Sequence, residues 1–284
     1  MVSKIQNERE ISMHPIINLG PIAIPSYGTI IAAGLLIGVL IASFTCKKYN
    51  IEKIDITLST ILACIGMIFG AKILFMLTVI PDVILEFSYV KSHIFETLIY
   101  MFGGYVFYGG LLGAFFGYWF YCRWFKIDFL IVMNVIAPVI PLVHGFGRIG
   151  CFLGGCCYGI EYHGKLAVNY PDNPFISELN NVPRFPVQLL ESFINFILCI
   201  GLLIYGRKPR KKGNVLGIYL IGYAIVRFSV EFLRGDVERG IFFGVSTSQW
   251  ISLILIPIGI YLIMKKYDDD KTKLASDTNI ENNV

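Results

Sequence analysis

Seven long apolar segments constrain the fold of this chain more than any other feature of the sequence. They cover residues 22–46, 56–80, 98–121, 128–150, 186–205, 214–233 and 245–264. About 20 helical residues cross the hydrocarbon core of a bilayer, and every segment is long enough to do so. The chain is 55% hydrophobic and only 15% charged, unlike an ordinary soluble domain. We therefore expect an all-α polytopic membrane protein with about seven transmembrane helices.

The basic residues between the segments predict how the chain lies in the membrane. Lys and Arg near the ends of spans stay on the cytoplasmic side. The loops after the first, third and fifth segments and the tail hold most of the 24 basic residues, which places the N-terminus outside and the C-terminus in the cytoplasm. We expect one integral membrane domain, residues 1–267, and a polar cytoplasmic tail, residues 268–284. Topology explains the basic clusters, so nucleic acid is not an expected partner.

Polar side chains gather in the outer half of the predicted bundle. At about 1.5 Å of rise per residue, Arg148 lies at the outer end of the fourth segment. His144 lies one turn deeper on the same face, and Arg227 and Glu231 form an i, i+4 pair in the sixth segment. The same side of the membrane receives Tyr27, Lys72 and Arg234.

Two interpretations of these charges are open. Guanidinium groups match phosphate oxygens, so the cluster suits the headgroup of an anionic phospholipid from the surrounding bilayer. Alternatively, Arg227 and Glu231 only neutralise each other, and Arg148 extends toward lipid headgroups. The agreement in depth favours a binding site.

Other motifs have simpler structural explanations. Gln188 and Glu191 share one face at the start of the fifth segment, and Ser246-Thr-Ser248-Gln249-Trp250 opens the seventh. Both are typical of helix caps and interfacial anchors. Small residues four apart allow helices to approach closely, and this pattern predicts helix packing at Gly109, Gly113 and Gly117, at Gly66 and Gly70, and at Gly34 and Gly38.

Cys151, Cys156 and Cys157 cluster where the fourth segment ends. They could form a disulfide that braces the following loop, supply soft metal ligands, or act as a redox or acyl-carrying nucleophile. A metal site is disfavoured because His163 is the only nearby histidine in the loop. Packing or a disulfide is the favoured interpretation, and no metal is assigned.

Taken together, these motifs resemble the prolipoprotein diacylglyceryl transferases over residues 14–264. These bacterial membrane enzymes move the diacylglyceryl group of phosphatidylglycerol onto the lipobox cysteine in the signal peptide of a prolipoprotein. The resemblance is carried, in order, by residues 22–28, 70–75, 108–113, 147–150, 184–191, 227–236 and 248–249. It implies phosphatidylglycerol and a prolipoprotein as partners, no cofactor, and an active site toward the outer face of the bacterial cytoplasmic membrane.

The resemblance also implies roles for single residues. Phospholipid binding falls on Arg148, with assistance from Arg227. We assign Tyr27, Lys72, Gln188 and Arg234 to substrate binding. Glu231 is expected to orient Arg227.

The sequence departs from the family pattern in three places. Tyr108 stands where the family has a histidine, and Lys72 stands where an arginine is usual. The signature reads Gly147-Arg148-Ile149-Gly150-Cys151, with Gly154 and Cys156 further on, where the family has asparagines and a glutamate. The chain thus looks like a divergent, cysteine-rich branch.

These departures determine the mechanism that we expect. His144 is our candidate base because imidazole titrates near neutrality, and neighbouring positive charge favours its neutral form. A purely structural histidine is the alternative. Tyr108 is a candidate hydrogen-bond donor but a poor base at neutral pH.

The departures also leave two other functions open. One is a phospholipid-dependent transferase with a different thiol or small-molecule acceptor. The other is a non-catalytic protein that binds lipid or takes part in thiol redox chemistry.

Overall fold

The computed structural model describes residues 16–19, 22–85, 91–170, 182–236 and 240–266, and these are predominantly helical. Five helices are long and apolar enough to cross a membrane, and two bent helix pairs raise the number to as many as seven. This confirms the prediction of an all-α polytopic membrane protein. The orientation stays a prediction, and the tail at 268–284 lies outside the described residues.

The chain divides into two compact units, which are described separately. The first unit contains the residues up to Gly38 and those from Met133 onward, and the second contains Val39–Val132. Helix α1 (Ser26–Thr45) begins in the first unit and ends in the second.

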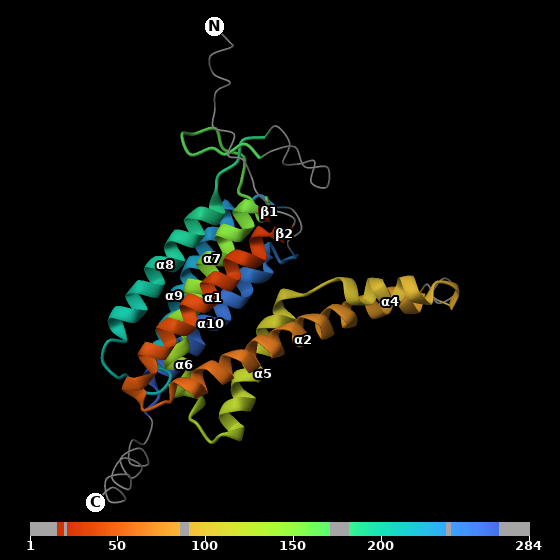
Figure 1. Ribbon diagram of the computed structural model, residues 1–284. Coiled ribbons are helices and arrows are strands. Elements are labelled where there is room, and N and C mark those ends of the chain that lie inside the picture. Colours follow the sequence, from red (N-terminus) through yellow and green to blue (C-terminus); the bar gives the residue numbers. More distant parts are fainter. Residues whose placement is uncertain (1–15, 20–21, 86–90, 171–181, 237–239, 267–284) are drawn as a thin grey trace, which may run out of the picture. The chain divides into compact units, whose positions relative to one another are not determined.

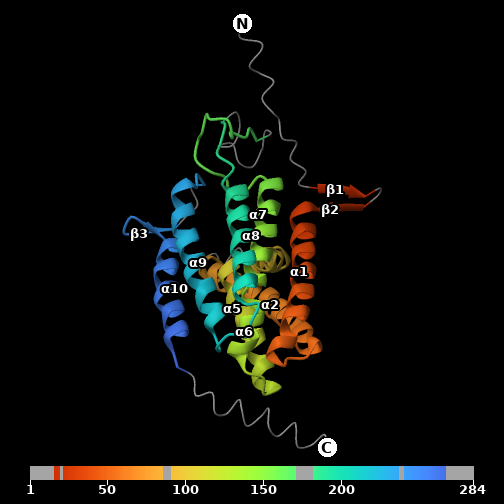
Figure 2. The same cartoon turned by 90° about the vertical axis from the view of Figure 1, so that its left-hand side faces the viewer.

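Four helices form the main body of the first unit: α7 (Val139–Leu153), α8 (Val187–Tyr205), α9 (Asn214–Val230) and α10 (Thr247–Met264). They run alongside one another, with α8 between α7 and α9, and α10 against α9 (Figures 1 and 2). The start of α1 packs on α7, where a Cβ atom added to Gly34 would lie 2.7 Å from the Cβ of Phe146.

Proline and polar caps define where several of these helices begin and end. Helix α6 (Phe129–Ile136) is bent by 44° from α7, and Pro138, which lacks a backbone N–H, lies in the break. Helix α10 opens with a capping box between Ser246 and Gln249. The interpretation of residues 246–250 as a helix cap is therefore confirmed.

Two short antiparallel hairpins precede α1 and α10, and the apolar pattern did not predict them. They consist of β1 (Ile16–Leu19) with β2 (Ile22–Pro25), and of β3 (Ile241–Phe242) with β4 (Val245–Ser246). Because β2 takes up residues 22–25, the first long helix begins at Ser26.

The second unit is built on the close approach of α2 (Lys53–Leu85) and α5 (Phe107–Trp124). A Cβ atom added to Gly113 would lie 2.0 Å from the carbonyl oxygen of Gly66, and one added to Gly70 would lie 2.3 Å from that of Gly109. The predicted glycine contact is thus confirmed. Helix α4 (Ile94–Gly103) precedes α5 and is bent from it by 68°.

We predict that Gly113→Ala destabilises the protein by about 1–3 kcal/mol, because the added methyl group forces the two backbones apart. Gly201→Ala in α8 is the matched control, since nothing lies within 4 Å of its added Cβ atom. Denaturant-induced unfolding in detergent micelles measures both. Equal unfolding free energies for the two variants would contradict the close-contact explanation.

Candidate functional site

A buried ion pair joins α7 to α8. The Nε atom of Arg148 lies 3.0 Å from Oε2 of Glu191, whose side chain is 2% exposed. The same Nε atom lies 3.2 Å from Nε2 of His144, one turn earlier on α7. Arg148 contacts both partners through Nε. The N–H donors of its two Nη groups are therefore still available for another ligand.

Nε2 of His144 has two partners of opposite character. It accepts the hydrogen bond from Arg148, and it also lies 3.4 Å from Oε1 of Glu191. A neutral imidazole can accept from the guanidinium, whereas a protonated imidazole can donate to the carboxylate. The ring can therefore exchange one partner for the other when it gains a proton.

A second buried ion pair lies between α9 and the short 3₁₀ helix η3 (Glu231–Leu233) that follows it. Nη1 of Arg227 is 2.7 Å from Oε2 of Glu231, as predicted from their spacing. Nη2 of Arg227 donates to Oγ of Ser248 on α10 at 2.6 Å. Both charged side chains are almost fully buried, so the pair orients the guanidinium and links α9 to α10.

Both ion pairs influence the ring of His144. The positive charges of Arg148 and Arg227 both act on the ring of His144, and the ring of Tyr223 on α9 lies 5.8 Å from it. His144, Arg148 and Arg227 thus lie in the first unit on α7 and α9, which both pack against α8, and their convergence on one ligand stays a prediction.

Gln188 holds the loop after α7 against the start of α8. Its amide nitrogen donates to the carbonyl oxygen of Cys156 at 2.8 Å, and its side chain exchanges hydrogen bonds with the hydroxyl of Tyr170. Burial raises the pKa of Tyr170 to about 12, which keeps this hydroxyl protonated. These contacts give Gln188 a positioning role, and its contact with a substrate stays a prediction.

Arg234 and Tyr27 flank the same loop. Arg234 pairs with the carboxylate of Asp236, and its backbone bridges to Gly159 in the loop. Tyr27, in the first turn of α1, packs so closely on α7 that a Cβ atom at Gly150 would lie 2.9 Å from its ring. The start of α1 thus packs on the end of α7, and the segment after η3 pairs with the loop.

Lys72 and Tyr108 belong to the second unit. Nζ of Lys72 donates to the carbonyl oxygen of Phe102 and lies 3.9 Å from the ring centroid of Tyr105. Tyr108, at the start of α5, is 39% exposed and packs edge-on against Phe107. Both residues lie beside the break between α4 and α5, and their roles toward a substrate stay predictions.

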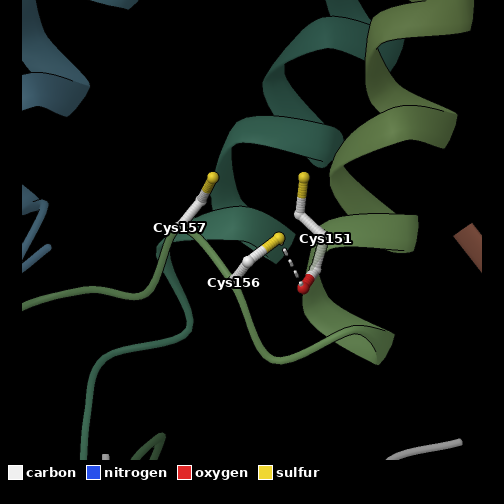
Figure 3. Close-up of side chains that lie close together, drawn as sticks. All are labelled: Cys151, Cys156 and Cys157. Carbon is white, nitrogen blue, oxygen red and sulfur yellow. Dashed lines mark hydrogen bonds between the residues drawn. The ribbon is translucent and has the colours of Figure 1, made fainter. Parts of the chain in front are cut away.

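The three clustered cysteines lie close together at the end of α7, and the thiol of Cys156 donates to the carbonyl oxygen of Cys151 at 3.7 Å (Figure 3). The Sγ atoms of Cys151, Cys156 and Cys157 all lie within 4.8 Å of one another, and all three are free thiols. Interaction with the other two thiols, followed by the charges of Arg148 and Arg234, lowers the pKa of Cys157, whereas interaction with its two neighbours raises the pKa of Cys156.

Sequence reasoning did not assign Glu191 or Ser248 to the site. Both were interpreted as helix-start residues, yet Glu191 is the partner of Arg148 and Ser248 is a partner of Arg227. The signal for Glu191 was present, because a carboxylate inside an apolar helix needs a cationic partner. No comparable feature of the sequence pointed to Ser248.

The fold and these contacts define a polytopic membrane protein with buried arginine–carboxylate pairs in its helix bundle. The family model described as "Prolipoprotein diacylglyceryl transferase" matches residues 14–265. The chain therefore belongs to the prolipoprotein diacylglyceryl transferase family, as its motifs predicted.

Curated relatives carry the corresponding enzyme name. Phosphatidylglycerol–prolipoprotein diacylglyceryl transferase of Clostridium tetani is 36% identical over 251 residues, which are 88% of this chain and 96% of the relative. An enzyme of that name with the suffix 2, from Clostridium perfringens, is 36% identical over 89% of this chain and 93% of its own length. The Rickettsia bellii enzyme is 33% identical over 89% of this chain and 95% of its own.

We predict that Glu191→Ala destabilises the fold by about 3–5 kcal/mol, because it leaves Arg148 buried without its carboxylate. The matched control is Glu161→Ala, which removes an exposed partner of His163 and should cost at most about 1 kcal/mol. Denaturant unfolding in micelles measures both. In the double variant Arg148→Met, Glu191→Leu, most of the stability should return. An equally small loss in both single variants would refute the importance of the buried pair.

Proposed function

We propose that this protein transfers the diacylglyceryl group of phosphatidylglycerol to the lipobox cysteine of a prolipoprotein and releases glycerol phosphate. Membership of the family and the names of the relatives support the two substrates. The single observation that carries the proposal for this site is the half-buried Arg148, which pairs with the buried Glu191 through Nε and retains its Nη donors. The reaction takes place toward the outer face of the bacterial cytoplasmic membrane.

The phosphate of the lipid binds to the two guanidinium groups. Arg148 offers its Nη groups, and Arg227 is held in place by Glu231 and Ser248. Two cations next to the phosphate stabilise the charge that develops on the leaving oxygen. The acyl chains remain among the apolar helices, so the lipid does not have to leave the bilayer. Arg234, which is oriented by Asp236, adds positive charge at the loop.

The reaction itself is a substitution at a glycerol carbon. The sulfur of the acceptor cysteine forms a new bond to that carbon, and the carbon–oxygen bond to the phosphate breaks. Glycerol phosphate leaves with the bonding electron pair, and the product peptide carries a thioether. The nucleophile must be a thiolate, so the proton of the thiol has to be accepted before or during the attack.

His144 is the proposed acceptor of this proton. When its ring is neutral, Nε2 accepts a hydrogen bond from Arg148 at 3.2 Å. When Nε2 takes the proton, it can donate to Glu191, 3.4 Å away, and the carboxylate stabilises the imidazolium. Proton uptake also releases Arg148 from His144.

We predict that Arg148→Ala lowers the rate of transfer by about 100- to 1000-fold, as expected for loss of a donor that stabilises a developing anion. The assay uses purified protein, phosphatidylglycerol vesicles and a lipobox peptide. Arg207→Ala, an exposed arginine in the loop after α8, is the control and should retain full activity. Full transfer by Arg148→Ala would refute the phosphate role.

For His144→Gln we predict a loss of at least about 100-fold at neutral pH and a rate that rises with pH, because hydroxide then deprotonates the thiol in place of the base. His163→Gln, which changes an exposed histidine, should keep the wild-type pH profile. If the activity of His144→Gln is undiminished at every pH, His144 is not the base.

A further inference from the structure

The thiols of Cys151, Cys156 and Cys157 have the spacing of metal ligands. All three sulfur atoms lie within 4.8 Å of one another. The centre of a triangle with edges of that length is about 2.8 Å from each corner, and a zinc–sulfur bond is about 2.3 Å long. A contraction of about half an ångström at each sulfur therefore brings the three thiolates to bonding distance.

The backbone is shaped to bring the three sulfur atoms together. Gly155, in the turn after α7, has a φ of 71°, and the amide of Cys156 donates back to the carbonyl oxygen of Cys151 at 3.1 Å. Cys157 has a φ of 57°, a left-handed conformation that is costly for a residue with a Cβ atom. This conformation aims two successive cysteines at one space, and such strain persists where the surroundings impose it.

The surroundings hold this arrangement in place. Gln188 binds the carbonyl oxygen of Cys156 at 2.8 Å, and Phe152 and Tyr170 belong to a buried cluster under the loop. The positive charges of Arg148 and Arg234 act on Cys157. Three thiolates around a divalent ion carry one net negative charge, which these cations offset.

Within the described part of the chain, this cluster has three metal-ligating side chains. His163, the histidine in the same loop, is 72% exposed and pairs with Glu161 at 2.9 Å. Among the described residues, the three cysteines alone form a group of at least three metal-ligating side chains. Structural zinc sites are closed by four protein ligands, whereas catalytic sites have three and keep one position open.

We infer that Cys151, Cys156 and Cys157 bind one Zn²⁺ ion and leave its fourth position for the thiol of the acceptor cysteine. A thiol bound to zinc loses its proton and becomes the thiolate that attacks the glycerol carbon. The proton passes to His144 or to water, and the neutral thioether product is a weaker ligand that can leave. This inference rests on the proposed function, and it supplies an acceptor-side group where the family's asparagines and glutamate are absent.

The position of the cluster suits this role. Cys151 follows Arg148 by three residues on α7, so the two side chains leave the helix about one turn apart. A nucleophile at the cysteines would thus reach a lipid whose phosphate is held at Arg148.

Metal content of the full-length chain tests the site. The protein is purified in detergent under reducing conditions, incubated with Zn²⁺ and desalted, and we expect about one zinc ion per chain. Cys151→Ser, Cys156→Ser and Cys157→Ser should each lower the zinc affinity at least tenfold, whereas Cys64→Ser, a half-buried thiol in α2, should not. Circular dichroism and size exclusion verify that each variant is folded. Metal-free wild-type protein, unchanged zinc binding in all three variants, or a disulfide within the cluster would overturn the site.

Cobalt substitution tests the open position without any turnover. Co²⁺ in the same site gives a thiolate-to-metal absorption band, and a lipobox peptide added without phosphatidylglycerol should intensify it. The same peptide with serine in place of cysteine should leave it unchanged. If both peptides act alike, the fourth position does not take the thiol. These two measurements do not depend on catalysis. If the protein binds zinc and the thiol but never releases glycerol phosphate, the proposed function is refuted and the zinc site is not.

Discussion

The need to pair buried charge in an apolar helix bundle determines how this site is built. An arginine or a glutamate inside a membrane-spanning helix is costly unless it meets a partner. Arg148 meets Glu191 across the contact of α7 with α8, and Arg227 meets Glu231 and Ser248 at the junction of α9 with α10. The charged groups that suit a phosphate are therefore also the groups that link neighbouring helices. Their positions are set by helices.

The loop after α7 is tied to this frame by polar contacts of its own. Gln188 binds the carbonyl oxygen of Cys156, and Arg234 bridges to Gly159. These contacts bring the three cysteines to the end of the helix that carries Arg148 and His144. The phosphate-binding and thiol-binding parts of the proposed reaction thus share one helix, although they depend on different chemistry.

The sequence was sufficient to predict a chain built of membrane-length helices, because an apolar run of about 20 residues has few alternatives to a membrane helix. It also predicted the Arg227–Glu231 pair, since that contact follows from spacing along one helix. It did not predict that Glu191 pairs with Arg148, because such a contact depends on which helices are neighbours. The bend at Pro138 and the left-handed backbone of Cys157 depend on tertiary context in the same way.

The proposed function requires that the chain cleaves phosphatidylglycerol at the bond between its diacylglyceryl group and its phosphate and delivers that group to a thiol. The most direct measurement follows both products of the wild-type protein at once, with phosphatidylglycerol labelled in its headgroup and a lipobox peptide analysed by mass spectrometry. Glycerol phosphate and thioether-linked diacylglyceryl peptide should appear in equal amounts, and neither should appear when the peptide has serine in place of its cysteine. Glycerol phosphate released without peptide modification, or no release at all, would contradict the proposed function.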